Sequence, residues 1–281
     1  MPKPLPTAPL AYNNKDFMHS KAARSLRMLA EYYDPLVRLR RAAVGDAIVM
    51  FGSARILPRD VAVARLEKLR KQKKGRGTKQ HKALLREARW DVDASTYYED
   101  ARELAKRLTR WSMTLSNLPR RFVVCSGGGP GIMEAANRGA YEAGGKSIGL
   151  GIQLPFEQRP NPYISPELNF NFHYFFMRKL WFSQLSKALI VFPGGFGTMD
   201  ELWEMLTLQQ TGKLDPNNLI LLYGRSYWKS VMDLKVMIRW RVINQRDYDM
   251  VQYADSVDEA FDKVRDGLVK HHMKLDGDWR A

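Results

Sequence analysis

Hydrophobic and polar residues follow two kinds of pattern along the chain. Short runs of consecutive apolar residues that end at glycine or a polar residue are typical of buried parallel strands, and apolar residues three or four positions apart are typical of helices. The predicted strands are AIVMFGSAR (47–55, running into a loop), RFVVCS (121–126), KSIGLGIQL (146–154), KALIVF (187–192) and NLILLYG (218–224), which closes the sheet. Because these strands alternate with helical segments, the pattern predicts an α/β fold, a parallel sheet with helices on both faces.

Segments outside this alternation are predicted to be helical. A helical pattern runs from about Lys21 to Ala43, and Pro35 is expected to break or kink it. The stretch after the last predicted strand has amphipathic helical patterns. We therefore divide the chain into an N-terminal tail and helical region (1–45), an α/β domain (46–230) with an insertion at about 62–93, and a C-terminal helical extension packed on the core (231–281).

The positive charge is concentrated in the insertion. The net charge is +15, and residues 65–89 hold 11 Lys and Arg against two acids, so this segment carries +9 and the other 256 residues carry +6. Gly75 and Gly77 mark a turn between two charged helical arms, which predicts an inserted basic helical hairpin. Its surface is either a solvated charged arm or a binding site for a polyanion such as nucleic acid. Trp90 is its only aromatic residue.

The composition excludes several classes of protein. A hydrophobic share of 45% is ordinary for a globular protein, and the longest apolar runs fall far short of the roughly 20 residues of a membrane span. The start of the chain lacks a secretory apolar core, so we expect a soluble, cytoplasmic protein without membrane contact. The single cysteine, Cys125, is expected to be a buried thiol rather than a nucleophile. The five histidines show no metal-ligand spacing, and we expect no metal.

Two glycine-rich turns lie at the carboxyl ends of predicted strands, where open α/β sheets bind ligands. The first is SGGGPG (126–131) and the second is PGGFGT (193–198), and a helix follows each of them. Glycine lets a ligand approach the backbone closely, and the start of a helix offers free N–H groups, so each turn suits an anion such as phosphate. The alternative is that both are only tight turns between a strand and a helix.

Neither turn matches a standard nucleotide-binding fingerprint. The sequence has no G-x-x-x-x-G-K-[ST] loop, the first turn departs from G-x-G-x-x-G, and no acidic residue ends the next strand. These features argue against a dinucleotide-binding protein and against a P-loop NTPase.

Charged residues accompany the second turn. Thr198 and Glu201 have the spacing of a helix capping box, in which Glu201 bonds back to the Thr198 N–H. Alternatively, Asp200 and Glu201 project a carboxylate into a phosphate-lined cleft, where it stabilises an oxocarbenium-like transition state or positions water. Arg178 and Lys179, which lie among aromatic residues, either extend to solvent or contact a phosphate.

The segments GGGPGIMEAANRGAYEAGG (127–145) and PGGFGTMDE (193–201) together resemble the Lonely Guy (LOG) family, often labelled "lysine decarboxylase-like". Its hallmark is P-G-G-x-G-T-x-x-E preceded by an Arg-Lys pair. The resemblance spans about Ala47 to Thr211, interrupted by the basic insertion. It implies a Rossmann-like fold and a phosphoribohydrolase, which hydrolyses the N-glycosidic bond of a nucleoside 5′-monophosphate, AMP-like or a cytokinin riboside monophosphate, to free base and ribose 5-phosphate.

The same resemblance implies roles for individual residues. Arg178 and Glu201 match the family's catalytic pair, with Arg178 contacting the phosphate or assisting the departing base. The candidate substrate-binding residues are Gly52, Ser53, Gly128, Gly129, Met133, Glu134, Lys179, Gly194, Gly195, Phe196, Gly197, Thr198, Met199, Asp200 and Thr207. The expected partners are a nucleoside monophosphate and further copies of the chain in a homodimer or higher homo-oligomer. No cofactor is expected, and the sequence has no pyridoxal-phosphate lysine motif.

This sequence also departs from the compact members of the family. It adds the N-terminal helical region, the basic hairpin and the C-terminal extension, and the segment 156–166, with EQRPNPY, resembles a longer bacterial branch. Plant cytokinin specificity is therefore not assumed. Two other functions remain open: a non-catalytic carrier of a phosphorylated ligand such as molybdenum cofactor, and nucleic-acid binding through the hairpin.

Overall fold

The computed structural model describes residues 3–72, 77–115, 120–155 and 159–273, and at its centre lies a parallel sheet of seven strands. The strands are β1 (Ala47–Phe51), β2 (Val123–Ser126), β3 (Ser147–Ile152), β4 (Asn169–Phe172), β5 (Ser186–Val191), β6 (Leu219–Tyr223) and β7 (Val251–Ala254). Their order across the sheet is β4-β3-β2-β1-β5-β6-β7. The chain therefore builds outward from β1 to β4, returns to β5 on the other side of β1, and builds outward again. The order reverses between β1 and β5, and open sheets bind ligands at such a point.

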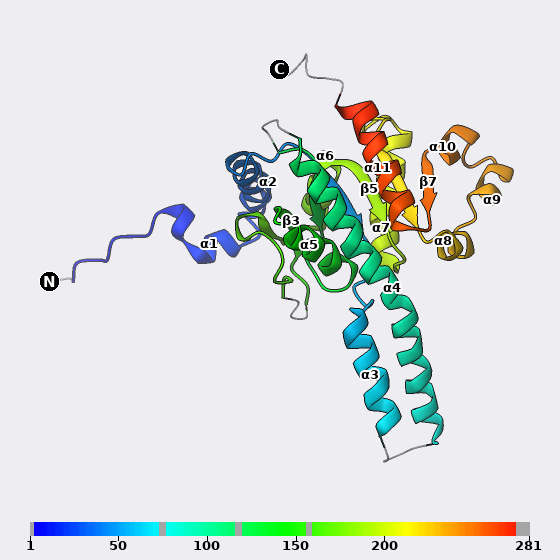
Figure 1. Cartoon of the computed structure of the whole chain (residues 1–281). Coiled ribbons are helices and arrows are strands. Elements are labelled where there is room, and N and C mark those ends of the chain that lie inside the picture. Colours follow the sequence, from blue (N-terminus) through cyan, green and yellow to red (C-terminus); the bar gives the residue numbers. More distant parts are fainter. Residues whose placement is uncertain (1–2, 73–76, 116–119, 156–158, 274–281) are drawn as a thin grey trace.

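Helices cover both faces of the sheet, as predicted (Figure 1). Side chains alternate between the faces, so Ile48 and Met50 belong to one half of the core and Val49 to the other. The first half is covered by α4 (Lys79–Met113), α5 (Ile132–Glu142) and α11 (Val257–His272). The second is covered by α2 (Arg24–Arg41), α6 (Phe175–Leu185), α7 (Phe196–Gln210) and α8 (Arg225–Val231). The remaining short elements are η1 (Ala11–Asn13), α1 (Lys15–His19), α3 (Arg59–Lys71), η2 (Pro166–Leu168), α9 (Leu234–Arg239) and α10 (Gln245–Asp249).

Pro35 does not end the N-terminal helix, contrary to the prediction of a break. Helix α2 runs through it from Arg24 to Arg41. Proline has no N–H, so the carbonyl of Glu31 four residues earlier loses its helical partner. The indole Nε1 of Trp181 in α6 donates a hydrogen bond of 3.1 Å to that carbonyl. A contact between helices thus replaces the missing bond and joins α2 to the core.

The basic insertion is a helical hairpin, as predicted, but its second helix does not end at the body of the protein. Helix α4 continues for 35 residues, so the second helix of the hairpin and the helix that covers the sheet are one element. Helix α3 and residues 79–95 of α4 form what we call the arm, which projects away from the sheet (Figure 1). Gly77 has a φ of +86°, and Gly75 lies outside the described residues. Nowhere in the part of the chain that the structure describes is a helix both long and apolar enough to cross a membrane.

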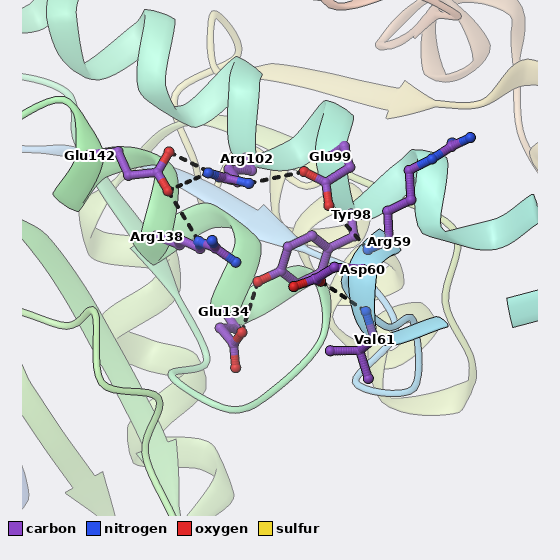
Figure 2. A network of polar contacts seen from close by, with 9 residues as sticks. All are labelled: Arg59, Asp60, Val61, Tyr98, Glu99, Arg102, Glu134, Arg138 and Glu142. Carbon is purple, nitrogen blue, oxygen red and sulfur yellow. Dashed lines mark hydrogen bonds and ion pairs between the residues drawn. The ribbon is translucent and has the colours of Figure 1, made fainter. Parts of the chain in front are cut away.

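A polar network joins the base of the arm to α5 (Figure 2). Glu99 of α4 accepts a hydrogen bond of 3.2 Å from the backbone N–H of Arg59 at the start of α3. Glu99 also pairs with Arg102 at 3.1 Å, and Arg102 pairs with Glu142 of α5 at 2.6 Å. The start of α3, the middle of α4 and the end of α5 are therefore held together.

Both edges of the sheet differ from the sequence prediction. The strand at 218–224 does not close the sheet, because β7 pairs with β6 beyond it, so the C-terminal extension contributes a strand as well as helices. At the other edge β4 pairs with β3. The edge strands have the sequences Asn-Phe-Asn-Phe in β4 and Val-Gln-Tyr-Ala in β7, so polar residues interrupt the continuous apolar runs that marked the central strands.

Candidate active site

A cavity of about 1060 Å³ lies where the strand order reverses. Its walls are the loops that follow β1, β2 and β5, together with parts of α6, α7 and α8. The residues that line it are Phe51, Gly52, Ser53, Ala54, Arg55, Ile56, Gly127, Met133, Arg178, Phe182, Pro193, Gly194, Gly195, Phe196, Gly197, Thr198, Met199, Glu201, Trp203, Tyr227, Val231 and Met232. The structure thus brings the second glycine turn, the end of β1 and the predicted catalytic pair to one place.

Ser53 joins the three loops at this edge of the sheet. Its backbone N–H donates to the carbonyl of Pro193 at 3.0 Å, and its carbonyl accepts a bond of 3.1 Å from the N–H of Ile132 at the start of α5. Gly131 has a φ of +69°, and a Cβ there would lie 2.3 Å from the Ser53 carbonyl oxygen. Only glycine fits that close approach.

The two helix starts that suit an anion differ in what already occupies them. Neither helix has a side-chain cap, but the first N–H of α5 donates to the Ser53 carbonyl, whereas the first N–H of α7, that of Phe196, has no hydrogen-bond partner among the described residues. A Cβ on Gly195 or Gly197 would meet no atom within 4 Å, and neither residue has a positive φ. Neither the backbone conformation nor packing within the described chain therefore requires glycine at these positions. They leave the start of α7 open to the cavity.

Arg178 and Glu201 form a buried ion pair in the wall of the cavity. Nη2 of Arg178 donates a hydrogen bond of 2.8 Å to Oε1 of Glu201, and their side chains are 14% and 4% exposed. The guanidinium also lies 5.3 Å from the ring centroid of Phe175 and 5.6 Å from that of Phe182. Aromatic faces and a carboxylate together hold the arginine in place.

This environment changes the acidity of Glu201 and leaves a donor free on Arg178. Burial raises the pKa of the Glu201 carboxyl above its ordinary value, and the Arg178 and Lys179 charges offset only part of that effect. Nε of Arg178 is buried and has no hydrogen-bond partner among the described residues. A buried unpaired donor is costly, so this atom suits an acceptor supplied by a ligand.

The capping-box interpretation of Thr198 and Glu201 is wrong. Because α7 begins at Phe196, Thr198 lies in the first turn of the helix and Glu201 in the second, and Glu201 is paired with Arg178 instead. Thr198 is 7% exposed and lies against Gly194, where a Cβ would be 2.1 Å from the Thr198 hydroxyl oxygen. Glycine at position 194 is thus required by packing against the helix.

A second cavity of about 480 Å³ adjoins the first and contains more of the predicted residues. Ala54, Gly127, Met133 and Arg178 line both cavities, and Gly128 and Gly129 line the second. Asn161 positions this first glycine turn: its N–H donates to the Gly128 carbonyl at 2.9 Å, and its Nδ2 donates to the Gly129 carbonyl at 3.1 Å.

Four predicted binding residues lie outside both cavities. Nζ of Lys179 pairs with Asp200 at 2.8 Å and with Glu204 at 2.9 Å, which links α6 to α7. Burial opposes the charge of Lys179, but these two bonds outweigh it and raise the pKa of the ammonium. The Thr207 hydroxyl donates to the carbonyl of Trp203 within α7. Glu134 accepts a bond of 2.8 Å from the Tyr98 hydroxyl (Figure 2).

Several cavity residues were not predicted. The Tyr227 hydroxyl of α8 donates a bond of 2.6 Å to the carbonyl of Gly194 and so supports the second glycine turn. Arg55 brings a second guanidinium to the cavity, and Phe182 and Trp203 add aromatic walls. Arg55 lies directly after the Gly-Ser-Ala turn that follows β1, and this position is the feature of the sequence that could have identified it as a cavity residue. No feature of the sequence identifies Tyr227, because it lies in a segment without a motif.

The described residues contain no group of three or more His, Cys, Asp and Glu side chains that could hold a metal ion. Cys125 is buried in β2, and burial raises the pKa of its thiol well above the ordinary value. A thiol with a raised pKa is a poor nucleophile, in agreement with a packing role.

Known proteins are similar in sequence to the part of the chain that forms this site. The model of a family described as "Possible lysine decarboxylase" matches residues 133–264, from the first turn of α5 into α11. A relative from Oryza sativa subsp. japonica, named "Probable cytokinin riboside 5'-monophosphate phosphoribohydrolase LOGL3", is 25% identical over 194 residues, which cover 65% of this chain and 82% of the relative. Both matches agree with the resemblance of the sequence to the LOG family.

Two solved structures are similar to this chain. The molybdenum cofactor binding protein from the phototrophic bacterium Rippkaea orientalis is 19% identical, covers 61% of this chain and 87% of its own, and has a TM-score of 0.43. The molybdenum cofactor carrier protein from Chlamydomonas reinhardtii is 22% identical, and the match covers 62% of this chain and 89% of the carrier protein, with a TM-score of 0.42. These values carry no information on ligand or activity.

The word decarboxylase in the family description finds no counterpart in the site. No lysine is among the described residues that line either cavity. Lys179, next to the catalytic pair in sequence, is held by two carboxylates. The described residues that line the two cavities therefore offer no amine for a Schiff base with pyridoxal phosphate.

Proposed function

We propose that this protein, which resembles the LOG family, hydrolyses the N-glycosidic bond of a nucleoside 5′-monophosphate and releases the free base and ribose 5-phosphate. The buried ion pair of Arg178 and Glu201, in the wall of a cavity that also contains the open start of α7, carries this proposal. The relative named as a probable phosphoribohydrolase supports the class of reaction.

The phosphate binds at the start of α7. Free N–H groups and the positive end of the helix dipole attract an anion there, and Gly195 and Gly197 leave the space that it needs. The second guanidinium, from Arg55, lines the same cavity. Binding energy from the phosphate holds the distant C1′ carbon of the ribose beside Glu201, so the phosphate contributes to the chemical step.

The chemical step breaks the bond between C1′ and the base nitrogen, and the electron pair leaves with the base. Positive charge develops on the sugar, and the Glu201 carboxylate stabilises that charge in the transition state. A water oxygen then bonds to C1′, and its proton passes to Glu201 and on to the departing base. Arg178 favours the ionised form of Glu201, and its free Nε offers a hydrogen bond to the phosphate or the base.

The test is turnover on a panel of substrates. The protein is incubated with AMP, GMP, CMP and a cytokinin riboside monophosphate, and free base and ribose 5-phosphate are measured. We expect release from at least one monophosphate and much slower release from its nucleoside, which lacks the phosphate. Equal turnover of both would contradict the role of α7, and tight binding of nucleotides without turnover would favour a carrier.

A further inference from the structure

In the described residues of the outer part of the arm, several basic side chains have no acidic partner. The sequence has no Asp or Glu between Glu67 and Glu87. On α4, the exposed side chains of Lys79, Lys82, Arg86 and Arg89 form what we call the basic stripe. Within the described ranges none of these four makes an ion pair, and the same holds for Lys68, Arg70 and Lys71 at the end of α3.

The stripe faces away from the contact between the two helices of the arm. That contact contains the buried residues Ala62 and Leu66 of α3 and His81 and Ala88 of α4. At 3.6 residues per turn, the four residues of the stripe fall within a sector of about 80°, on the side of α4 away from His81 and Ala88. Four cations thus form a continuous line on the accessible side of the arm.

Helix stability does not explain this line of charge. Lys79 and Lys82 lie in the first turns of α4, where the helix dipole disfavours cations. Lys82 and Arg86 are one turn apart, and like charges at that spacing destabilise a helix. By contrast, Arg65 is paired with Glu87 and Asp91 nearer the body of the protein. Positive charge is therefore paired with carboxylates where the two helices of the arm are joined, and the cations of the basic stripe are left without such partners.

An exposed aromatic residue extends the stripe. Trp90 is 70% exposed and lies one helical turn after Arg86 on the same side of α4. We propose that the basic stripe and Trp90 bind single-stranded nucleic acid, with the phosphates on the stripe and a base stacked on the indole. Basic side chains along the backbone and an aromatic face for a base are the two elements of such sites.

The same residues are poorly suited to a membrane surface. A helix that lies on a membrane buries a broad apolar face between its basic residues. In the described part of the arm the leucines are buried or half-buried, and Val61 and Trp90 are the large hydrophobic side chains that are exposed. One indole beside a row of cations fits a nucleic-acid strand better than a lipid surface.

The first test measures the affinity of the full chain for a fluorescein-labelled RNA of mixed sequence at about 50 to 200 mM salt. The stripe variant carries Lys79→Gln, Lys82→Gln and Arg86→Gln, and glutamine keeps the helix propensity high. The control carries Lys235→Gln, Arg239→Gln and Arg246→Gln, which remove the same charge from exposed positions on α9 and α10. We expect the stripe variant to lower the slope of log K against log salt by about 2, at 0.7 per phosphate contact, and the control to change it little.

The second test separates stacking from charge. We expect Trp90→Ala to weaken binding of the single strand about ten-fold and to leave binding of the matching duplex unchanged, because paired bases are not available for stacking. Equal losses in the stripe variant and the control would overturn the proposal. Binding of phosphatidylserine vesicles or polyglutamate, without binding of the RNA, would overturn it as well.

Discussion

Arg178 donates a hydrogen bond of 2.8 Å to Glu201, although 23 positions separate the two residues and strand β5 lies between their helices. Both side chains are almost fully buried. A buried ion pair contributes little to stability compared with apolar residues of the same size, because both charges must leave water. Its presence in the wall of a cavity therefore favours a chemical role over a structural one.

The substitution Glu201→Gln tests that role directly. Glutamine keeps the size of the side chain and an oxygen that accepts from Arg178, but it cannot stabilise a developing positive charge as a carboxylate does. We expect a folded protein with turnover at saturating AMP, or the best substrate of the panel, reduced by about 10²-fold or more, equivalent to about 3 kcal/mol of barrier. Glu204→Gln, one turn further along α7 and outside the cavity, is the matched control. Near-normal turnover of folded Glu201→Gln would remove the residue from the mechanism.

The glycines of the second turn separate ligand binding from packing. Gly195→Ala and Gly197→Ala place a methyl group where the chain has no atom within 4 Å. Alanine also restricts the unfolded chain, so we expect the free energy of unfolding of the free protein to be unchanged or higher by about 0.4–1 kcal/mol. The methyl group would displace the phosphate from the start of α7, and the loss of one bond to a charged group, about 1.5–3 kcal/mol, lowers kcat/KM by about 10- to 10²-fold.

Gly194→Ala is the contrasting variant. Its Cβ would lie 2.1 Å from the Thr198 hydroxyl oxygen, so we expect a loss of about 1–3 kcal/mol of stability from overpacking. Thermal unfolding and steady-state kinetics of the three proteins check the set. If Gly195→Ala and Gly197→Ala keep full kcat/KM, the phosphate does not bind at this turn.

The sequence predicted the parts of the molecule that have a strong local pattern. Continuous apolar strands, both glycine turns and the helical hairpin follow from residues close together in the chain, and the resemblance supplied Arg178 and Glu201. The contacts of Tyr227 with Gly194 and of Trp181 with Glu31 join segments 33 and 150 positions apart, and no local pattern encodes them. A break or a kink was expected at Pro35, and the break does not occur: a distant indole bonds to the carbonyl that proline leaves without a helical partner.

Tyr227→Phe tests whether support of the glycine turn matters for activity. The variant removes only the hydroxyl that donates to the Gly194 carbonyl, so we expect a loss of about 0.5–1.5 kcal/mol of stability. Because the turn becomes less well positioned for the phosphate, KM should rise while kcat stays near that of the unsubstituted protein. Tyr141→Phe, at an exposed position on α5, is the control. A lower kcat with unchanged KM would contradict this positioning role.

His272 predicts a dependence of stability on pH. Burial lowers the pKa of its imidazole, and the charge of Lys187 adds to that effect. The unfolded chain binds a proton near pH 6.5 and the folded chain binds it only at lower pH, so the contribution to stability is complete above pH 6.5 and is lost as the pH falls through the folded-state pKa. Urea unfolding of the wild type and His272→Gln between about pH 5 and 8 checks this. We expect the wild type to lose more stability in acid than the variant, and parallel curves would show that His272 does not titrate in this way.

The acid limb of the pH profile, the decrease of kcat/KM at low pH, tests how burial and the neighbouring charges set the pKa of Glu201. Burial raises the pKa of its carboxyl, and Arg178 and Lys179 hold that increase back. The ionised carboxylate is the active form, so kcat/KM should fall with decreasing pH, with an apparent pKa above the ordinary value for glutamate. Arg178→Gln removes the nearest positive charge, and the residual activity of that variant should fall at a still higher pH. Lys179→Gln, outside the cavity, should move the acid limb in the same direction by a smaller amount.

The pH profile is measured with saturating and with limiting nucleotide, so that titration of the substrate phosphate is separated from titration of the protein. An acid limb that stays in place when Arg178 is replaced would assign the titration to another group and remove the ionised Glu201 from the proposed mechanism.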